Sequence, residues 1–303
     1  MNPRPKTDPG GPGGPGGPGG PGFEAECQAA VDIAEEAGGL LRSRFRRAFR
    51  IHPKGEDGDV VTELDLLAEE LVTRRLAERF PSDRVVAEEG GGTGPGAGGG
   101  GGPSGRTWLV DPLDGSNNVV VGLPVYVVGI ALCVGDEPVL GVVHDPVTGR
   151  TWRAVRGGGA FGPRGRLRRP SGPPAPAGPV LAWTQGHGVP AGDPVCRALK
   201  EGLEAGSRRL LQLWAPLLTW SMLARGDIDG FVGYRAEEID LPAGCLLAAE
   251  AGLEIRRLDG GRFSGRIGQP DTARSFVAGR PEVLPHLLDL VARAAKPDDG
   301  FGP

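Results

Sequence analysis

The sequence predicts an α/β protein built as a layered sandwich, and three observations support this prediction. Helix-like and strand-like stretches are mixed along 303 residues, a length that fits one large domain or two modest ones. A proline-rich stretch at residues 163–179 marks a candidate boundary between two halves. Several strand or helix ends carry acidic residues, which is typical of the edge at which α/β sheets bind ligands.

The first half, residues 23–165, is predicted to combine two helices with a series of strands. Apolar residues at helical spacing predict helices over residues 24–49 and 64–80. The turn signal "GDEP" between two apolar runs predicts a hairpin. The predicted strands are "RVVAEE", "RTWLVD", "VYVVGIALCV", "PVLGVVHDP" and "TWRAV".

The second half, residues 166–296, is predicted to alternate strands and helices. Strands are predicted near residues 180–183, 229–232 and 275–278. Helices are predicted near residues 190–205 and 216–225, from residue 241, and over about 281–295.

Glycine and proline concentrate in two low-complexity segments. Residues 10–22 read "GGPGGPGGPGGPG", too few triplets for a collagen helix, so residues 1–22 are predicted to be a disordered tail. Residues 90–104 are mostly glycine, can bury nothing, and are predicted to form a flexible surface insertion whose role stays open. Residues 297–303 are predicted to be a short C-terminal tail.

Composition limits the classes of function. A net charge of −4 and a pI near 5.7 argue against binding to nucleic acid or an anionic membrane, which attract basic surfaces. No apolar run has the length of a membrane span, and the N-terminus lacks a secretion signal, so a cytoplasmic protein is expected. The four cysteines form no CxxC pair and are expected to be buried, reduced thiols.

The stretch "WLVDPLDGSNN", residues 108–118, carries the clearest chemical signal. Pro112 lacks an N–H, so the strand should leave its ladder there and aim Asp111, Asp114 and the Leu113 carbonyl into one small volume. Two carboxylates and a carbonyl suit a hard divalent cation. Gly115 and Ser116 could then open a helix or turn whose N–H groups accept an anion. An ordinary surface turn explains the same residues.

Three further acids stand at ends of predicted elements. Glu88 follows a short strand, Asp65 lies just after a strand-like stretch, and Asp240 precedes a helix. Each has a simpler explanation on its own: a solvated strand end, a first-turn acid and a helix cap, respectively. Together they favour a ligand-binding edge.

These motifs resemble the inositol monophosphatase superfamily. "WLVDPLDGSNN" is similar to its signature W-x-x-D-P-[LI]-D-G-[TS], and "DVVTELD", the Glu88-Glu89 pair and "IDLPAGCLLAAEAG" match its other motifs in order. The resemblance covers roughly residues 24–295 and implies a layered αβαβα sandwich of the inositol monophosphatase and fructose-1,6-bisphosphatase type. It also identifies "GGGAFG", residues 157–162, as a glycine-rich hairpin rather than a dinucleotide loop.

The resemblance implies a set of site residues. It assigns the side-chain ligands of two or three catalytic Mg²⁺ ions to four acids: Glu88, Asp111, Asp114 and Asp240. Leu113 contributes its carbonyl. Asp65 helps to hold a more weakly bound ion and, with the Ser116 hydroxyl, orients the attacking water.

Two more roles follow from the resemblance. Gly115 and Ser116 match residues whose N–H groups hold the phosphate, and Lys54 matches a lysine of a loop near the metals. The implied activity is Mg²⁺-dependent, lithium-sensitive hydrolysis of a small polyol or sugar phosphate, such as inositol monophosphate, in a homodimer.

The identity of the substrate stays open, because the residues that would contact the alcohol part of the substrate depart from the family pattern. The glutamate that contacts sugar hydroxyls is replaced by Gly233, and the tryptophan before the last ligand by Ile239. Trp214 and Pro216 stand where small residues line the substrate pocket. The alternatives are a nucleotide 3′-phosphatase, a fructose-1,6-bisphosphatase, a histidinol-phosphatase, or a non-catalytic relative that only binds ligands.

Overall fold

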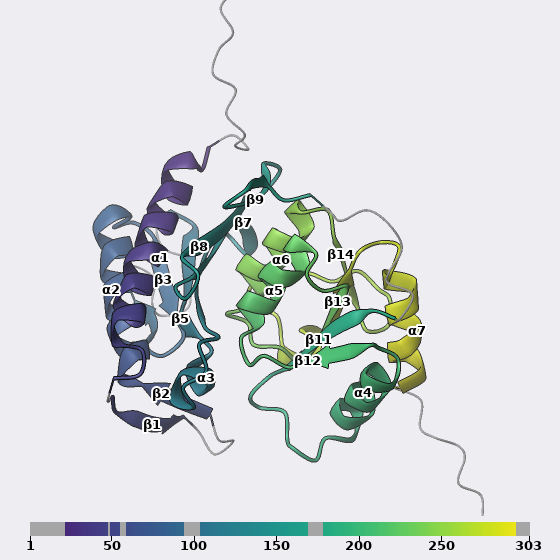
Figure 1. The fold of residues 1–303 in the computed structure, drawn as a ribbon. Helices are drawn as coiled ribbons and strands as arrows, with labels where there is room; N and C mark the ends of the chain where they lie inside the picture. Colours follow the sequence, from purple (N-terminus) through teal and green to yellow (C-terminus); the bar gives the residue numbers. More distant parts are fainter. Residues whose placement is uncertain (1–21, 48, 55–58, 94–103, 169–177, 295–303) are drawn as a thin grey trace, which may run out of the picture.

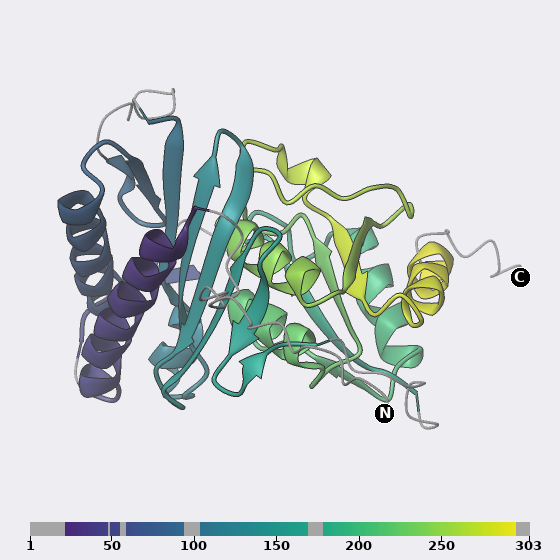
Figure 2. The same cartoon turned by 90° about the horizontal axis from the view of Figure 1, so that it is seen from above.

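The computed structural model describes residues 22–47, 49–54, 59–93, 104–168 and 178–294. Within them the chain forms five layers: helices, a large mixed sheet, helices, a smaller sheet and helices (Figures 1 and 2). The predicted α/β sandwich is therefore confirmed. The tails predicted at residues 1–22 and 297–303 lie outside the described residues, apart from Gly22. The division into two domains stays a prediction.

The outer layer of the first half consists of two helices on one face of the large sheet. Helix α1 spans Glu24–Arg44 and α2 spans Glu63–Arg79, preceded by the small hairpin of β1 (Ile51–Lys54) and β2 (Asp59–Thr62). The prediction of a helix to residue 49 is wrong, because Phe45 turns to extended backbone and Arg46 has φ +65°. Phe45 still packs against the core, which explains why its apolar spacing suggested a longer helix.

The large sheet has eight strands in the order β10-β9-β8-β7-β6-β5-β3-β4. The strands are β3 (Arg84–Ala87), β4 (Gly91–Thr93), β5 (Arg106–Asp114), β6 (Val127–Val134), β7 (Glu137–Asp145), β8 (Arg150–Val155), β9 (Gly159–Gly162) and β10 (Gly165–Arg166). The predicted β6–β7 hairpin and the glycine-rich hairpin at residues 157–162 are both present.

The prediction that residues 90–104 form only a flexible insertion is wrong at its start. Gly91–Thr93 form β4, which pairs antiparallel with β3. Backbone pairing needs no side chains, so glycine can take part in an edge strand despite its poor strand propensity. Residues 94–103 lie outside the described part of the chain.

The smaller sheet has five strands in the order β12-β11-β13-β15-β14. Its strands are β11 (Val180–Gln185), β12 (Arg209–Leu211), β13 (Gly230–Tyr234), β14 (Glu254–Arg257) and β15 (Phe276–Gly279). Helices α4 (Pro194–Ala205) and α7 (Leu284–Ala294) form the outer layer on one side. The helix predicted from residue 190 begins at Pro194 because Asp193 caps it by accepting from the Cys196 N–H (2.8 Å).

Helices α5 (Pro216–Arg225) and α6 (Leu241–Glu250) form the middle layer between the two sheets (Figure 2). Helix α6 lies so close to β7 that a Cβ on Gly141 would sit 2.8 Å from the Ala243 Cα. Both sheets therefore share packing with one helix layer. All four cysteines are buried and free, as expected. No helix in the described ranges is long and apolar enough to cross a membrane.

Candidate active site

Asp111 and Asp114 lie at the end of β5, and both are buried, with 3% and 4% of their surface exposed. The β5–β6 ladder is interrupted between these two residues and resumes where Asp114 faces Val127. The strand therefore leaves its ladder at Pro112, as predicted, but it does so in a bulge and continues to Asp114. The Asp111 side chain accepts from the Leu113 N–H (3.0 Å), which tightens the bulge. Burial excludes the alternative of an ordinary surface turn.

Asp240 reaches the same place from the second half of the chain. It precedes α6 but makes no side-chain bond to the helix N-terminus, so a capping role does not explain it. Carboxylate oxygens of Asp111, Asp114 and Asp240 all lie within 4.8 Å of one another. We refer to these three residues as the acid cluster.

The electrostatics of the acid cluster favour a bound cation. Burial, and after it the charge of neighbouring carboxylates, raises the pKa of Asp111 and Asp240 well above the usual range. Burial also raises the pKa of Asp114, although N–H donors from α5 partly offset this. Buried like charges cannot all ionise unless a positive charge compensates them. Oxygen ligands held this closely suit a hard divalent cation such as Mg²⁺.

Glu88 joins the acid cluster from the neighbouring strand. It follows β3, which pairs with β5 in parallel, and its N–H donates to the Val110 carbonyl (3.2 Å). Its charge and a side-chain hydrogen bond both act to raise the pKa of Asp111. The backbone of the next residue is tied to α2, because the Glu89 N–H donates to the Glu69 carboxylate (2.8 Å).

Asp65 and Ser116 meet next to the Leu113 carbonyl. Asp65 is buried in the first turn of α2, where it accepts from the Thr62 N–H (2.8 Å) in a capping box. The Ser116 hydroxyl contacts the Asp65 carboxylate and lies 3.0 Å from the Leu113 carbonyl oxygen. Burial raises the pKa of Asp65, while its hydrogen bonds act in the opposite sense. Asp65 is thus both the expected first-turn acid and a neighbour of the site.

Gly115 is required by the geometry of the turn. Its φ is +113°, and a Cβ there would lie 2.7 Å from the Val125 carbonyl oxygen. The chain then opens the short helix α3 at Ser116 (Ser116–Val120), as the sequence predicts. Lys54 ends strand β1, but its side chain is outside the described part of the chain.

One cavity of about 860 Å³ joins these residues to the second half of the chain. Leu113, Gly115 and Ser116 line it with Glu88, Asp111, Asp114 and Asp240, and so do Trp214, Pro216 and Ile239. Gly233 does not, because it faces the Phe276 ring, from which a Cβ would lie only 2.2 Å away.

Sequence reasoning missed part of the lining of this cavity. Glu237, His187, Gln185 and Gln212 line it. Glu237 accepts from the His187 N–H (2.8 Å), so two loops distant in sequence are joined here. In the sequence, only Glu237 could have been predicted to line the cavity, because it stands three residues before Asp240. Nothing in the sequence around His187 or Gln185 indicates such a position.

The fold and the buried acid cluster define a metal-dependent phosphatase. The sequence profile of the inositol monophosphatase family matches residues 24–294, and the chain belongs to this family. Members of the family hydrolyse phosphate monoesters, so the chain is a phosphoric monoester hydrolase.

Similar proteins include enzymes with different substrates in their names. The chain is 32% identical over 242 residues to human inositol monophosphatase 2, covering 78% of this chain and 82% of that protein. It is 28% identical over 233 residues to a fructose-1,6-bisphosphatase/inositol-1-monophosphatase of Thermotoga maritima, covering 76% and 84%. The crystal structure of the suppressor protein SuhB from Bartonella henselae superimposes with a TM-score of 0.78 at 25% identity, covering 92% of this chain and all of that one.

Proposed function

We propose that the protein is a Mg²⁺-dependent phosphomonoesterase that hydrolyses a small polyol or sugar phosphate, such as inositol monophosphate. One observation carries the proposal: Asp111, Asp114 and Asp240 converge within 4.8 Å inside a protein interior that cannot hold three uncompensated charges. The 32% identity to an inositol monophosphatase supports this substrate class.

The chain offers oxygen ligands for two or three ions. They are the carboxylates of Glu88, Asp111, Asp114 and Asp240, the Leu113 carbonyl and, for a more weakly held ion, Asp65. Divalent ions bound here would supply a nucleophile from water and neutralise charge on the phosphoryl and leaving oxygens. The Asp65 carboxylate holds the Ser116 hydroxyl in place, and this pair would orient the attacking water. The N–H groups of Gly115 and Ser116 would bind the phosphate.

Other substrates of the superfamily remain second candidates. The Thermotoga maritima relative carries both fructose-1,6-bisphosphatase and inositol-1-monophosphatase in its name, so one such site can serve more than one alcohol. Nucleotide 3′-phosphatase and histidinol-phosphatase activities, and a role confined to ligand binding, are the remaining alternatives. A cytoplasmic location and a homodimer stay predictions.

A phosphate-release screen tests the proposal. The purified chain is incubated with Mg²⁺ and a panel of monoesters that includes inositol 1-phosphate, fructose 1,6-bisphosphate, histidinol phosphate and adenosine 3′,5′-bisphosphate. Turnover that requires Mg²⁺ and is lost in Asp111→Asn supports it. Mg²⁺ binding without release of phosphate from any compound would instead support the binding relative.

A further inference from the structure

Trp214 combines two features that folding alone does not favour. More than half of its surface is exposed (56%), although it is the largest apolar side chain type. Its φ of +53° lies in the left-handed region, which bulky residues rarely occupy. Residues held in such conformations concentrate where a ligand is bound. Trp214 is therefore a candidate for ligand contact.

The backbone on both sides of Trp214 is fixed to the catalytic segment. On one side, the buried Asn118 side chain donates to the Leu213 carbonyl (2.7 Å) and to the Val125 carbonyl (2.8 Å). On the other side, Asp114 accepts from the Leu217 N–H (2.7 Å). The backbone that carries Trp214 is thus held at a defined position relative to the acid cluster, and Trp214 lines the same cavity.

The cavity lining combines hydrogen-bonding side chains such as Gln185, Gln212 and Glu237 with apolar side chains. Val120 and Val121 line the cavity, and Val121 is 67% exposed. Gly233, at the position where the family resemblance expects a glutamate, faces Phe276 and leaves no room for a side chain. A polyol needs several acceptors for its hydroxyls, whereas an exposed indole offers a flat apolar face and one N–H.

We propose that Trp214 is a specificity-determining residue that stacks on the leaving alcohol, so that the preferred substrates are phosphate monoesters whose alcohol carries a planar aromatic or heteroaromatic ring. This inference rests on the proposed phosphatase function, and among its candidate substrates it favours the ring-bearing histidinol and nucleotide phosphates over inositol monophosphate. An aromatic ring of the substrate can stack flat against the face of the Trp214 indole. Such stacking tolerates different types of ring. The lining residues Gln185, Gln212 and Glu237 offer hydrogen-bonding groups for the edge of the ring.

The test compares Trp214→Gly with Trp214→Phe on two pairs of substrates. Histidinol phosphate and adenosine 2′-monophosphate carry rings, and glycerol 2-phosphate and inositol 1-phosphate do not. Glycine accepts a φ of +53° without strain, so Trp214→Gly should fold, and its thermal unfolding midpoint checks this. Val147→Gly, an exposed apolar residue outside the cavity lining, is the matched control.

The expected result is a change in preference. Trp214→Gly should lower kcat/KM for the ring-bearing substrates about tenfold more than for the other pair, mainly through KM, while Trp214→Phe retains most of the preference. Equal losses on both pairs, or a larger loss on inositol 1-phosphate, would overturn the inference and leave the phosphatase function standing. A wild-type enzyme that turns over neither ring-bearing compound would also overturn the inference alone, whereas no phosphate release from these four compounds or from the panel under Proposed function would overturn both.

Discussion

Asp114 illustrates how one residue can belong to the site and to the scaffold at once. Its carboxylate lies in the acid cluster, and it also accepts from the N–H groups of Leu217 (2.7 Å) and Leu218 (3.3 Å) at the start of α5. The sequence predicted only the metal role. The two hydrogen bonds to Leu217 and Leu218 join residues 103 and 104 positions apart in the sequence. They depend on how α5 packs against β5, which no local sequence pattern encodes.

Replacing Asp114 separates these two roles. Asp114→Asn and Asp114→Ala should each lower kcat at least about a hundredfold, because both remove a ligand carboxylate. Asparagine keeps an oxygen acceptor for the Leu217 N–H, whereas alanine does not, so alanine should be less stable than asparagine by about 1 kcal/mol. Phosphate release gives the first quantity, and urea unfolding in metal-free buffer gives the second.

Asp145→Asn is the control for these variants. Asp145 is also buried, and it accepts from the Val147 N–H (2.9 Å) in a turn rather than in the acid cluster. This variant should keep its turnover. Turnover retained by Asp114→Asn would remove Asp114 from the metal site.

At the scale of elements, prediction succeeded where a pattern was long or chemically distinctive. Helix α5 begins and ends at the predicted residues, 216–225, because its apolar periodicity runs over its whole length. The strands β12 and β14 were missed, since three or four residues carry no resolvable period. The residues at the end of β5 were identified by their chemistry, whereas Glu237 and His187 converge only through loop packing.

Helix α1 packs on β7 through a contact that should make stability depend on pH. A Cβ on Gly38 would lie 2.3 Å from the His144 ring, so the helix approaches the imidazole directly. His144 is buried, and its Nδ1 lies 3.0 Å from the Thr151 hydroxyl. Burial lowers the pKa of His144, and the facing charges of Glu35 and Asp145 only partly oppose this.

The sign of this effect follows from proton linkage. The unfolded chain protonates His144 near pH 6.5, whereas the folded protein protonates it only at lower pH, so acid favours unfolding. Stability should therefore fall as the pH drops below about 6.5. In His144→Gln, the part of the loss in unfolding free energy that comes from His144 should disappear. Urea unfolding at pH 7.5, 6.0 and 5.0 measures this free energy. His286→Gln, at an exposed position, should keep the wild-type slope; identical slopes in all three proteins would refute the assignment.

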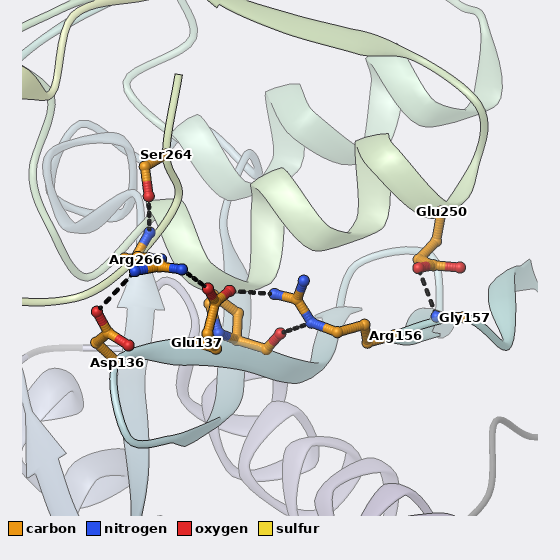
Figure 3. A network of polar contacts seen from close by, with 8 residues as sticks. Asp136, Glu137, Arg156, Gly157, Glu250, Ser264 and Arg266 are labelled. Carbon is orange, nitrogen blue, oxygen red and sulfur yellow. Dashed lines mark hydrogen bonds and ion pairs between the residues drawn. The ribbon is translucent and has the colours of Figure 1, made fainter. Parts of the chain in front are cut away.

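At the scale of the whole molecule, the two halves meet along the middle helix layer. A polar network joins them at the surface (Figure 3). Arg266 pairs with Asp136 (3.4 Å) and with Glu137, and Glu250 accepts from the Gly157 N–H (2.7 Å). These charged groups are about half exposed, so each pair should contribute less than about 1 kcal/mol. The buried packing of α6 on β7 is the stronger connection.

A cation bound to the acid cluster would add a connection between the halves. Asp111 and Asp114 come from β5 in the first half, and Asp240 stands at the start of α6 in the second. A cation bound to all three stabilises the folded arrangement but not the unfolded chain, in which these residues are far apart. At a hundredfold excess over its dissociation constant such an ion adds about 2.7 kcal/mol to the free energy of unfolding.

Metal removal should therefore lower the thermal unfolding midpoint. After treatment with EDTA, the midpoint should rise with added Mg²⁺, while NaCl of equal ionic strength should change it much less, because screening acts weakly on buried charges. Asp111→Asn should begin with a higher metal-free midpoint, since one buried charge is gone, and should lose the Mg²⁺-dependent rise. The same rise in Asp111→Asn would mean that Mg²⁺ acts elsewhere on the molecule, and an equal rise with NaCl would mean that ionic strength causes it; either result would rule out a metal connection between the two halves.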